Sequence, residues 1–228
     1  IFAIMREYIR KKQLEGPLSL LDAGCGQGRL LHQFHEDFAE IVAVDPDKNR
    51  IENARMQADE HGYLHKINFK IGLIEDIPND TQFDVIFCHH VLQHVPTDMI
   101  SKIISILKNH LKPGGLLFLA ASHSFERKDY YTKTYLKETD VCEERIDEQE
   151  FNQLVINNRN ILPSHFFTIS SLEERLEENQ LKLIDTQVYH ILDEHEAIPK
   201  SIKRDEDLNT FPFTKNLCGR DLFLVATL

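Results

Sequence analysis

Residues 18–30 read LSLLDAGCGQGRL, and this stretch constrains the fold more than any other part of the chain. Its first six residues are mostly apolar, which is typical of a strand buried inside a parallel sheet. Asp22 ends this run, and Gly24, Gly26 and Gly28 follow at every second position. Glycine permits positive φ and close approach of a ligand to the backbone, and the start of a helix offers free N–H groups. A strand, a glycine-rich turn and a helix in this order predict a nucleotide-binding turn.

The spacing of the glycines indicates which kind of nucleotide this turn accepts. The dinucleotide fingerprint G-x-G-x-x-G requires a glycine at position 29, where this chain has Arg29. This residue argues against a nicotinamide-dependent oxidoreductase. A second apolar run, residues 41–45, ends in Asp45, about 20 residues after the turn, where α/β nucleotide sites place a carboxylate on the ribose hydroxyls. The alternative is that Asp45 caps a helix, because Pro46 follows and proline favours the first helical position.

The composition is that of an ordinary globular enzyme. The chain has 228 residues, of which 42% are hydrophobic and 28% charged, so we expect one domain over residues 1–228. No apolar run reaches the roughly 18 residues that span a bilayer, and no signal-peptide pattern is visible. Because the first residue is Ile1, the sequence is compatible with a lost N-terminal segment.

Cysteine spacing indicates the cellular compartment of the protein, and its net charge limits the classes of partner that it can bind. The four cysteines (Cys25, Cys88, Cys142 and Cys218) form no C-x-x-C pair. This pattern favours free thiols and a cytoplasmic location. The net charge of −11 argues against a nucleic-acid or anionic membrane surface. The sequence does not indicate the oligomeric state.

Strand and helix patterns alternate along the chain, which predicts a doubly wound α/β sheet. We expect helices over residues 2–12, 29–38, 47–61, 98–111 and 170–180, and strands over residues 18–23, 41–45, 67–71, 83–88, 116–121, 181–189 and 222–227. Ser170 and Glu173 have the spacing of a capping box at the start of the last helix.

Two long segments do not fit this minimal frame. Residues 124–164 connect the fifth strand to the last helix, with helix expected around residues 143–158, and residues 192–218 separate the last two strands. Long excursions at the carboxyl edge of such a sheet tend to cover the ligand crevice. We therefore interpret residues 124–164 as a substrate-covering lid inserted after strand five, with surface decoration as the alternative.

The sequence D-A-G-C-G-Q-G at residues 22–28 resembles the first motif of class I S-adenosylmethionine-dependent methyltransferases. The resemblance covers residues 17–122 and, more loosely, residues 166–228. It implies a Rossmann-like, mostly parallel seven-stranded sheet with an antiparallel last strand, and an Asp22 that faces the methionine part of the cofactor. No pyrophosphate has to be held in such a site.

Later blocks resemble the small-molecule branch of the same family. The block FDVIFCHHVLQHV at residues 83–95 is similar to the fourth-strand motif of quinone-biosynthesis-type methyltransferases, and LKPGG at residues 111–115 is similar to their next landmark. No Asn-Pro-Pro-Tyr sequence follows the fourth strand, which argues against methylation of adenine or glutamine amides. Leu73 stands where many relatives carry an acid beside the adenine ring, so we expect Leu73 and Ile74 to sandwich that ring.

The motif and the resemblance together give the expected site residues. The residues expected to bind S-adenosylmethionine are Asp22, Gly24, Cys25, Gly26, Gly28, Asp45, Pro46, Leu73, Ile74, Glu75, Cys88 and His89.

Histidines near the ends of the fourth and fifth strands are the candidates for chemistry on the methyl acceptor. A general base is needed when the acceptor must lose a proton, and histidine suits that role near neutral pH. We expect His89, His90 or His123 to be catalytic, and His165 is a further candidate from the lid. In relatives, the position of Gln93 lines the reaction chamber.

His94 is interpreted as structural. His90 and His94 have a helical metal-ligand spacing, but no third ligand is evident and no metal is expected.

The sequence thus predicts S-adenosylmethionine-dependent methyl transfer to a small molecule, with oxygen as the favoured acceptor atom. Two alternatives remain open at this point: a tRNA wobble-uridine carboxymethyl methyltransferase, and a non-catalytic relative that binds the cofactor.

Overall fold

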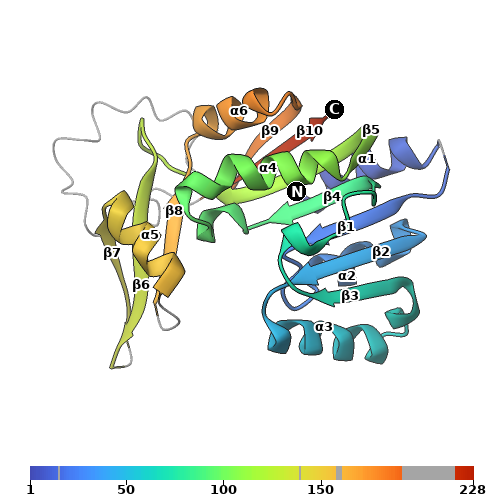
Figure 1. The fold of residues 1–228 in the computed structure, drawn as a ribbon, viewed down its shortest axis with the longest axis horizontal. Coiled ribbons are helices and arrows are strands. Elements are labelled where there is room, and N and C mark those ends of the chain that lie inside the picture. The colour runs from blue at the N-terminus through green and yellow to red at the C-terminus, as the bar shows by residue number, and fades with distance from the viewer. Residues whose placement is uncertain (15, 139, 158–160, 192–218) are drawn as a thin grey trace.

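The computed structural model describes residues 1–14, 16–138, 140–157, 161–191 and 219–228, so the segment 192–218 lies outside the described residues. Its main sheet has seven strands in the order β3-β2-β1-β4-β5-β10-β9 (Figure 1). The strands are β1 (Ser19–Ala23), β2 (Glu40–Asp45), β3 (Ile67–Ile71), β4 (Phe83–His89), β5 (Leu111–Ser122), β9 (Lys182–Ile191) and β10 (Gly219–Thr227). The pairings of β1 to β5 are parallel, whereas β10 is antiparallel to both of its neighbours. The expected sheet with an antiparallel last strand is confirmed.

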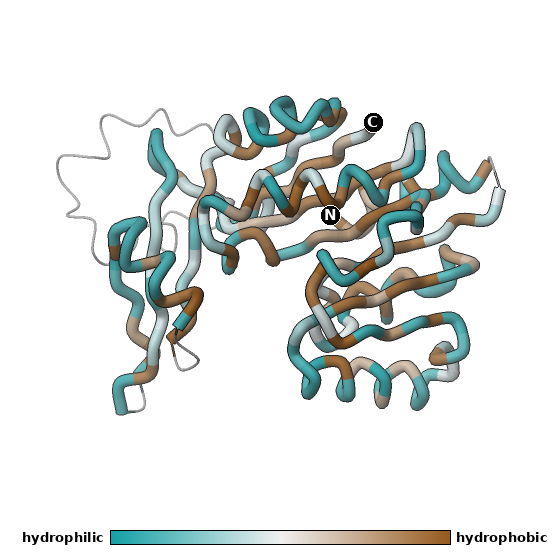
Figure 2. Tube along the Cα trace, in the orientation of Figure 1, coloured by the Kyte–Doolittle hydropathy of each residue, from teal (hydrophilic) through white to brown (hydrophobic). Residues whose placement is uncertain are grey.

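Helices cover both faces of this sheet. They are α1 (Phe2–Gln13), α2 (Arg29–Phe34), α3 (Lys48–Glu60), α4 (Ile100–Asn109) and α6 (Ile169–Glu178). Successive strand side chains alternate between two buried clusters: Leu20 packs with residues of α1, α2 and α3, whereas Leu21 packs with residues of α4 and α6. The main-sheet strands accordingly carry long hydrophobic stretches in Figure 2. Among the described helices, none combines the length and the apolar character needed to cross a bilayer.

Two expected helix ends are wrong. The helix α2 ends at Phe34 and continues as a short 3₁₀ turn, η1 (His35–Asp37), and does not run as one helix to residue 38. The helix α6 begins at Ile169, and its N-cap is Thr168, whose side chain accepts a hydrogen bond from the backbone N–H of Ser171. Ser170 therefore lies inside the helix, and the predicted capping box does not form.

The insertion after β5 folds into a second, smaller sheet. It contains β6 (Tyr130–Lys137), β7 (Asp140–Ile146), α5 (Glu148–Asn157) and β8 (Leu162–Phe166), with strand order β7-β6-β8 and antiparallel pairing. The helix expected around residues 143–158 is correct for α5 but wrong for residues 143–146, which pair with β6. Five of the seven residues of β7 are exposed and none is buried, so the strand carries no apolar alternation that would reveal it.

The insertion joins the main sheet beside the end of β5. The backbone N–H of Ser124 donates to the carbonyl of Phe167, and the N–H of Phe167 donates to the carbonyl of Ser122. The small sheet stands beyond the ends toward which β1, β2 and β4 point (Figure 1). The carboxyl edge of the main sheet is where ligands bind in open α/β folds, so the insertion lies on the ligand side of the molecule.

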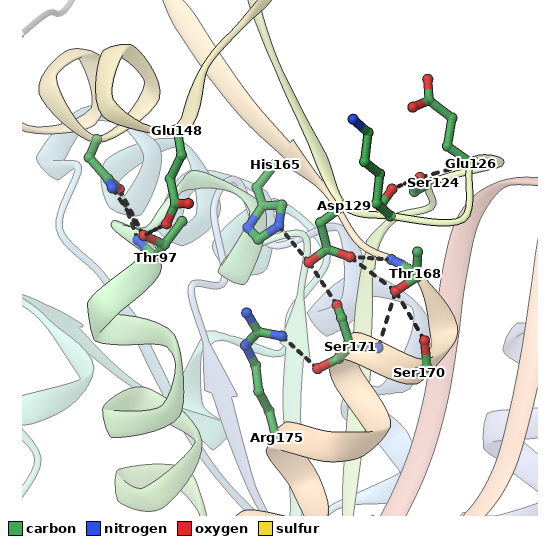
Figure 3. Close-up of polar contacts among 12 residues, drawn as sticks. Thr97, Ser124, Glu126, Asp129, Glu148, His165, Thr168, Ser170, Ser171 and Arg175 are labelled. Carbon is green, nitrogen blue, oxygen red and sulfur yellow. Dashed lines mark hydrogen bonds and ion pairs between the residues drawn. The ribbon is translucent and has the colours of Figure 1, made fainter.

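A partly buried acid, Asp129, ties the insertion to α6. The carboxylate of Asp129 accepts hydrogen bonds from His165 Nε2 at 2.9 Å, from Ser171 Oγ at 2.8 Å, and from both the N–H and the hydroxyl of Thr168 (Figure 3). Burial alone would raise the pKa of Asp129, but these hydrogen bonds outweigh it and hold the pKa below its usual value. The anchor is therefore ionised at neutral pH.

Candidate active site

The glycine-rich turn between β1 and α2 has the backbone that its sequence predicts. Gly24, Gly26 and Gly28 all have positive φ, of 78°, 54° and 82°. A Cβ on Gly24 would lie 2.3 Å from Val91 Cγ2, so this glycine allows close packing against the turn after β4. A Cβ on Gly26 would meet only Arg50 Nη1, at 3.7 Å. Only the end of the flexible Arg50 side chain lies near Gly26, so a ligand can approach the backbone there.

Asp22 lies at the carboxyl end of β1 and is almost fully buried. Its Oδ2 has no hydrogen-bond partner among the described residues. Burial, and next the negative charge of Asp45, raise the pKa of the Asp22 carboxyl to about 7. A buried oxygen without a partner costs free energy, and the cost is largest when the group is charged. This position therefore suits a ligand group that is positively charged or donates a hydrogen bond.

Asp45 ends β2 and holds the glycine-rich turn in place. Its Oδ2 accepts a hydrogen bond from Gly26 N at 2.9 Å, and its Oδ1 accepts one from Asp47 N at 2.9 Å. The alternative that Asp45 caps the next helix is wrong, because α3 begins at Lys48 and Asp47 is its N-cap. A carboxylate has about four lone-pair sites, so Asp45 can accept two more donors such as a vicinal diol. Pro46 follows it in the loop.

The residues expected beside an adenine ring differ in exposure. Leu73 is 53% exposed, which is high for a large apolar side chain next to a candidate site. Ile74 is buried in the core, in the cluster that includes residues of α4, and Glu75 is exposed. The side chain of Leu73 is therefore accessible to a flat ring, whereas that of Ile74 is enclosed in the core.

Two cysteines lie beneath the site. Cys88, on β4, is fully buried, and burial raises the pKa of its thiol to about 12. Burial also raises the pKa of Cys25, in the glycine-rich turn. Both thiols are free and stay protonated at neutral pH, so they act by packing.

His89 and His90 are adjacent at the end of β4, but their surroundings differ. The Nε2 atom of His89 is buried and has no partner within the described part of the chain. The rings of Phe87 and Phe223 lie 6.0 and 5.8 Å from the His89 ring. Burial, followed by the charges of His90 and Arg29, lowers the pKa of His89 to about 3. His89 is thus a neutral packing residue and a weak base.

Hydrogen bonds engage the backbone N–H and both ring nitrogens of His90. Its φ is +56°, a conformation that residues with a Cβ adopt rarely and that clusters at functional sites. Its backbone N–H donates to the carbonyl of Ala120 at 2.8 Å. Its ring Nδ1 lies 3.0 Å from Gln93 Oε1, and its Nε2 lies 3.2 Å from the hydroxyl of Tyr189.

The remaining candidate histidines have structural contacts. His94 Nδ1 lies 2.8 Å from the carbonyl of Pro163, so His94 connects the turn after β4 to β8, as its structural interpretation expected. His123 is 1% exposed and lies where the insertion joins the sheet. His165 is fully buried and bonded to Asp129, so it belongs to the anchor of the insertion.

The helical spacing of His90 and His94, which could have suited a metal, is not realised, because the two residues do not share a helical face. His90 lies in the positive-φ turn that precedes η4 (Leu92–His94). In the described ranges, no group of three or more His, Cys, Asp or Glu side chains is arranged to hold a metal ion.

Sequence reasoning missed Tyr189 as a site residue. Tyr189 is on β9 and pairs with Asp221 on β10. It reaches His90 only because β9 and β10 extend the sheet beyond β5. Asp221 is buried and bonded to the guanidinium of Arg220. No local motif signals these contacts, since they join segments about a hundred residues apart, as the separation of His90 and Tyr189 shows.

A family model described as a methyltransferase domain matches residues 14–205. The ubiquinone biosynthesis O-methyltransferase of Rickettsia prowazekii is 33% identical over 103 residues, which are 45% of this chain and 39% of that relative. The match to the corresponding Rickettsia canadensis protein covers 48% of this chain and 45% of the relative. This chain therefore aligns with less than half of the length of these curated relatives.

Solved structures share the fold over nearly the whole chain. An S-adenosylmethionine-dependent methyltransferase from Clostridium acetobutylicum matches with a TM-score of 0.63 and 18% identity, over 97% of this chain and 89% of that one. The 1,6-didemethyltoxoflavin-N1-methyltransferase of Burkholderia thailandensis, solved with 1,6-didemethyltoxoflavin and S-adenosylhomocysteine, matches with a TM-score of 0.63 and 17% identity, over 99% of this chain and 75% of that one.

Proposed function

This chain belongs to the methyltransferase-domain family, and we propose that it transfers the methyl group of S-adenosylmethionine to an oxygen atom of a small-molecule acceptor. One observation carries the proposal. At the carboxyl ends of β1 and β2, an Asp22 oxygen is buried without a partner in the described chain. The adjoining turn has only the end of the Arg50 side chain near Gly26, and the Gly26 N–H donates to the carboxylate of Asp45.

The chain's residues fit S-adenosylmethionine part by part. The ammonium group of the methionine part would supply the donor and the positive charge that the Asp22 carboxyl lacks. The remaining lone pairs of Asp45 would accept the two ribose hydroxyls, and the exposed face of Leu73 would contact the adenine ring. Gly24, Cys25, Gly26 and Gly28 would form the backbone floor, and Pro46, Ile74, Glu75, Cys88 and His89 would complete the surroundings.

Methyl transfer to a hydroxyl requires that the acceptor be oriented toward the methyl group and that a base remove its proton. When bound, S-adenosylmethionine supplies a methyl group that is already activated as a sulfonium. The chain's own residues must then orient the acceptor, exclude water and remove a proton if the acceptor is a hydroxyl. We assign the role of proton acceptor to His90. Desolvation lowers the pKa of His89 to about 3, and His123 is buried where the insertion joins the sheet.

The surroundings support a small acceptor. The matched relatives are named for O-methylation in ubiquinone biosynthesis, which supports oxygen as the acceptor atom. A net charge of −11 is unsuited to tRNA. The insertion after β5, predicted from the sequence over residues 124–164, stands on the ligand side of the sheet and would serve as the lid over the acceptor. The buried free thiols support a cytoplasmic location for the reaction.

The test combines binding with turnover. Calorimetry should show that the chain binds S-adenosylmethionine and S-adenosylhomocysteine but not NAD. A screen of phenols, hydroxy acids and other hydroxylated metabolites, read as release of S-adenosylhomocysteine, should then identify an acceptor. Cofactor binding without turnover on any acceptor would indicate a non-catalytic relative, and turnover on tRNA alone would indicate a wobble-uridine enzyme. Either result would overturn the proposal.

A further inference from the structure

A continuous chain of hydrogen bonds runs from β9 through the turn after β4 to the insertion. It links the Tyr189 hydroxyl to His90 at 3.2 Å, His90 to Gln93 at 3.0 Å, Gln93 Nε2 to His94 Nε2 at 3.3 Å, and His94 Nδ1 to the carbonyl of Pro163 at 2.8 Å. Gln93 Oε1 also accepts from the backbone N–H of Ser122 at 2.9 Å, which fixes its orientation.

The chemistry of these groups determines where each proton lies. The amide oxygen of Gln93 can only accept, so His90 must carry a proton on Nδ1. The carbonyl of Pro163 can also only accept, so His94 carries its proton on Nδ1 and accepts from the Gln93 amide at Nε2. If His90 is neutral, its Nε2 is an acceptor, and the Tyr189 hydroxyl donates to it. Every donor in this series of hydrogen bonds then faces an acceptor.

We propose, on the basis of the function assigned above, that Tyr189 and Gln93 belong to the proton-transfer machinery: Gln93 holds His90 in the form protonated on Nδ1, and Tyr189 carries the acceptor's proton to His90 Nε2. Tyr189 is the catalytic residue of this pair, because its oxygen meets the acceptor. Gln93 is a positioning residue that acts through His90.

The proton transfer is balanced without any additional reactant. The acceptor O–H bond breaks and its proton moves to the Tyr189 oxygen, while the Tyr189 proton moves to His90 Nε2. The acceptor oxygen forms the new bond to the methyl carbon, and the electron pair of the broken carbon–sulfur bond stays on sulfur. His90 ends as an imidazolium that donates from Nδ1 to Gln93, and it returns the proton to water after the product leaves.

Charged groups around His90 set when it can accept this proton. Burial lowers the pKa of His90, and the hydrogen bond to Gln93 and the charge of Asp221 on β10 only partly offset this effect. Arg29 on α2 and Arg220 on β10 lower the pKa further. Burial raises the pKa of Tyr189 to about 12, so its hydroxyl keeps its proton and can act only as a relay. His90 is thus neutral at pH 7 and ready to accept.

The first test needs no turnover. Nitrogen-15 NMR of the free chain near pH 7 should show His90 protonated on Nδ1 and unprotonated on Nε2. The Gln93→Glu variant retains an acceptor for His90 and for Ser122 N, and its carboxylate should raise the pKa of His90. A wild-type His90 that carries its proton on Nε2 would overturn the assignment, whether or not the chain is an enzyme.

The second test measures proton transfer. Tyr189→Phe should lower kcat by about 10²–10⁴-fold, the usual effect of removing acid–base catalysis, with unchanged affinity for S-adenosylmethionine. Tyr8→Phe is the matched control. Tyr8 also bonds through its hydroxyl to a side chain of β9, Asp185, at 3.3 Å, but does not touch His90. It should keep its kcat. Gln93→Glu should move the acidic limb of the pH–rate profile to higher pH.

The outcomes separate the relay from simpler schemes. If His90→Asn loses turnover while Tyr189→Phe keeps it, His90 takes the proton directly and the relay is wrong. Asparagine is used because it tolerates positive φ better than alanine does. If the wild-type chain methylates no acceptor, both the proposed function and the proton relay are wrong. The Nδ1 assignment of His90 is then judged by the NMR spectrum alone.

Discussion

At the scale of single residues, the glycine-rich turn offers a test with a matched control. Gly26 and Gly114 both have positive φ, of 54° and 71°, and an added Cβ would meet only the end of a basic side chain at 3.7 Å in each case. Valine should therefore impose similar backbone strain at either position. Only at Gly26 would the branched side chain enter the space assigned to the cofactor.

We expect Gly26→Val to abolish measurable binding of S-adenosylmethionine, while Gly114→Val loses similar stability but keeps its affinity. Calorimetric titration gives the affinities, and thermal unfolding shows whether both variants fold. Unchanged cofactor affinity in Gly26→Val would show that the site lies elsewhere.

Residues that act through a local sequence pattern could be predicted, whereas those that act through tertiary contacts could not. Asp22, Gly26 and Asp45 lie at strand ends and turns that the pattern marks directly. The sequence could not distinguish His89 from His90, because only the positive φ of His90 and its bond to Tyr189 separate their roles. It also could not show that Asp47 caps α3 and leaves Asp45 available.

At the scale of elements, the order of strands and helices was largely predictable, since apolar runs alternate with amphipathic stretches and end at turn residues. The insertion was harder to predict. No side chain of β7 is buried and four of its seven residues are charged, so the strand forms because it pairs with β6 rather than because it buries side chains. Its tip presents Leu136 and Val141 opposite one another, both more than 70% exposed.

The insertion gives the prediction at this scale. Its base is fixed by Asp129 and by the backbone bonds at Ser124 and Phe167, whereas the β6–β7 hairpin has few buried side chains. Hydrogen exchange measured with and without S-adenosylhomocysteine should show protection rising across residues 124–164, most of all in the hairpin. Strand β10, which lies inside the main sheet, serves as the internal reference. Equal exchange in both states, with full activity after the hairpin is shortened, would reduce the insertion to surface decoration.

At the scale of the whole molecule, the candidate site opposes folding stability. The carboxyl of Asp22 has a pKa of about 7 in the folded chain, against about 3.9 when unfolded. Between these values the folded chain binds a proton that the unfolded chain releases. The free energy of unfolding therefore loses a contribution as pH rises from about 4 to 7, and the loss is complete above pH 7. Four histidines act in the opposite direction: desolvation lowers the pKa values of His89, His90, His94 and His165, so their contribution to stability grows as pH rises.

The variant Asp22→Asn isolates this effect, because the histidines contribute equally to both chains. We expect the variant to gain stability relative to wild type as pH rises from 4 to 8, by about 2–4 kcal/mol in total. The amide itself changes stability by an amount that does not depend on pH, so the slope of the difference is the quantity to measure. Urea unfolding at several pH values, without ligand, gives that slope, and calorimetry should show that the same variant binds S-adenosylmethionine more weakly. A difference that stays constant with pH would show that Asp22 is not held protonated by burial, and would remove the main physical argument that its carboxyl awaits a cationic group.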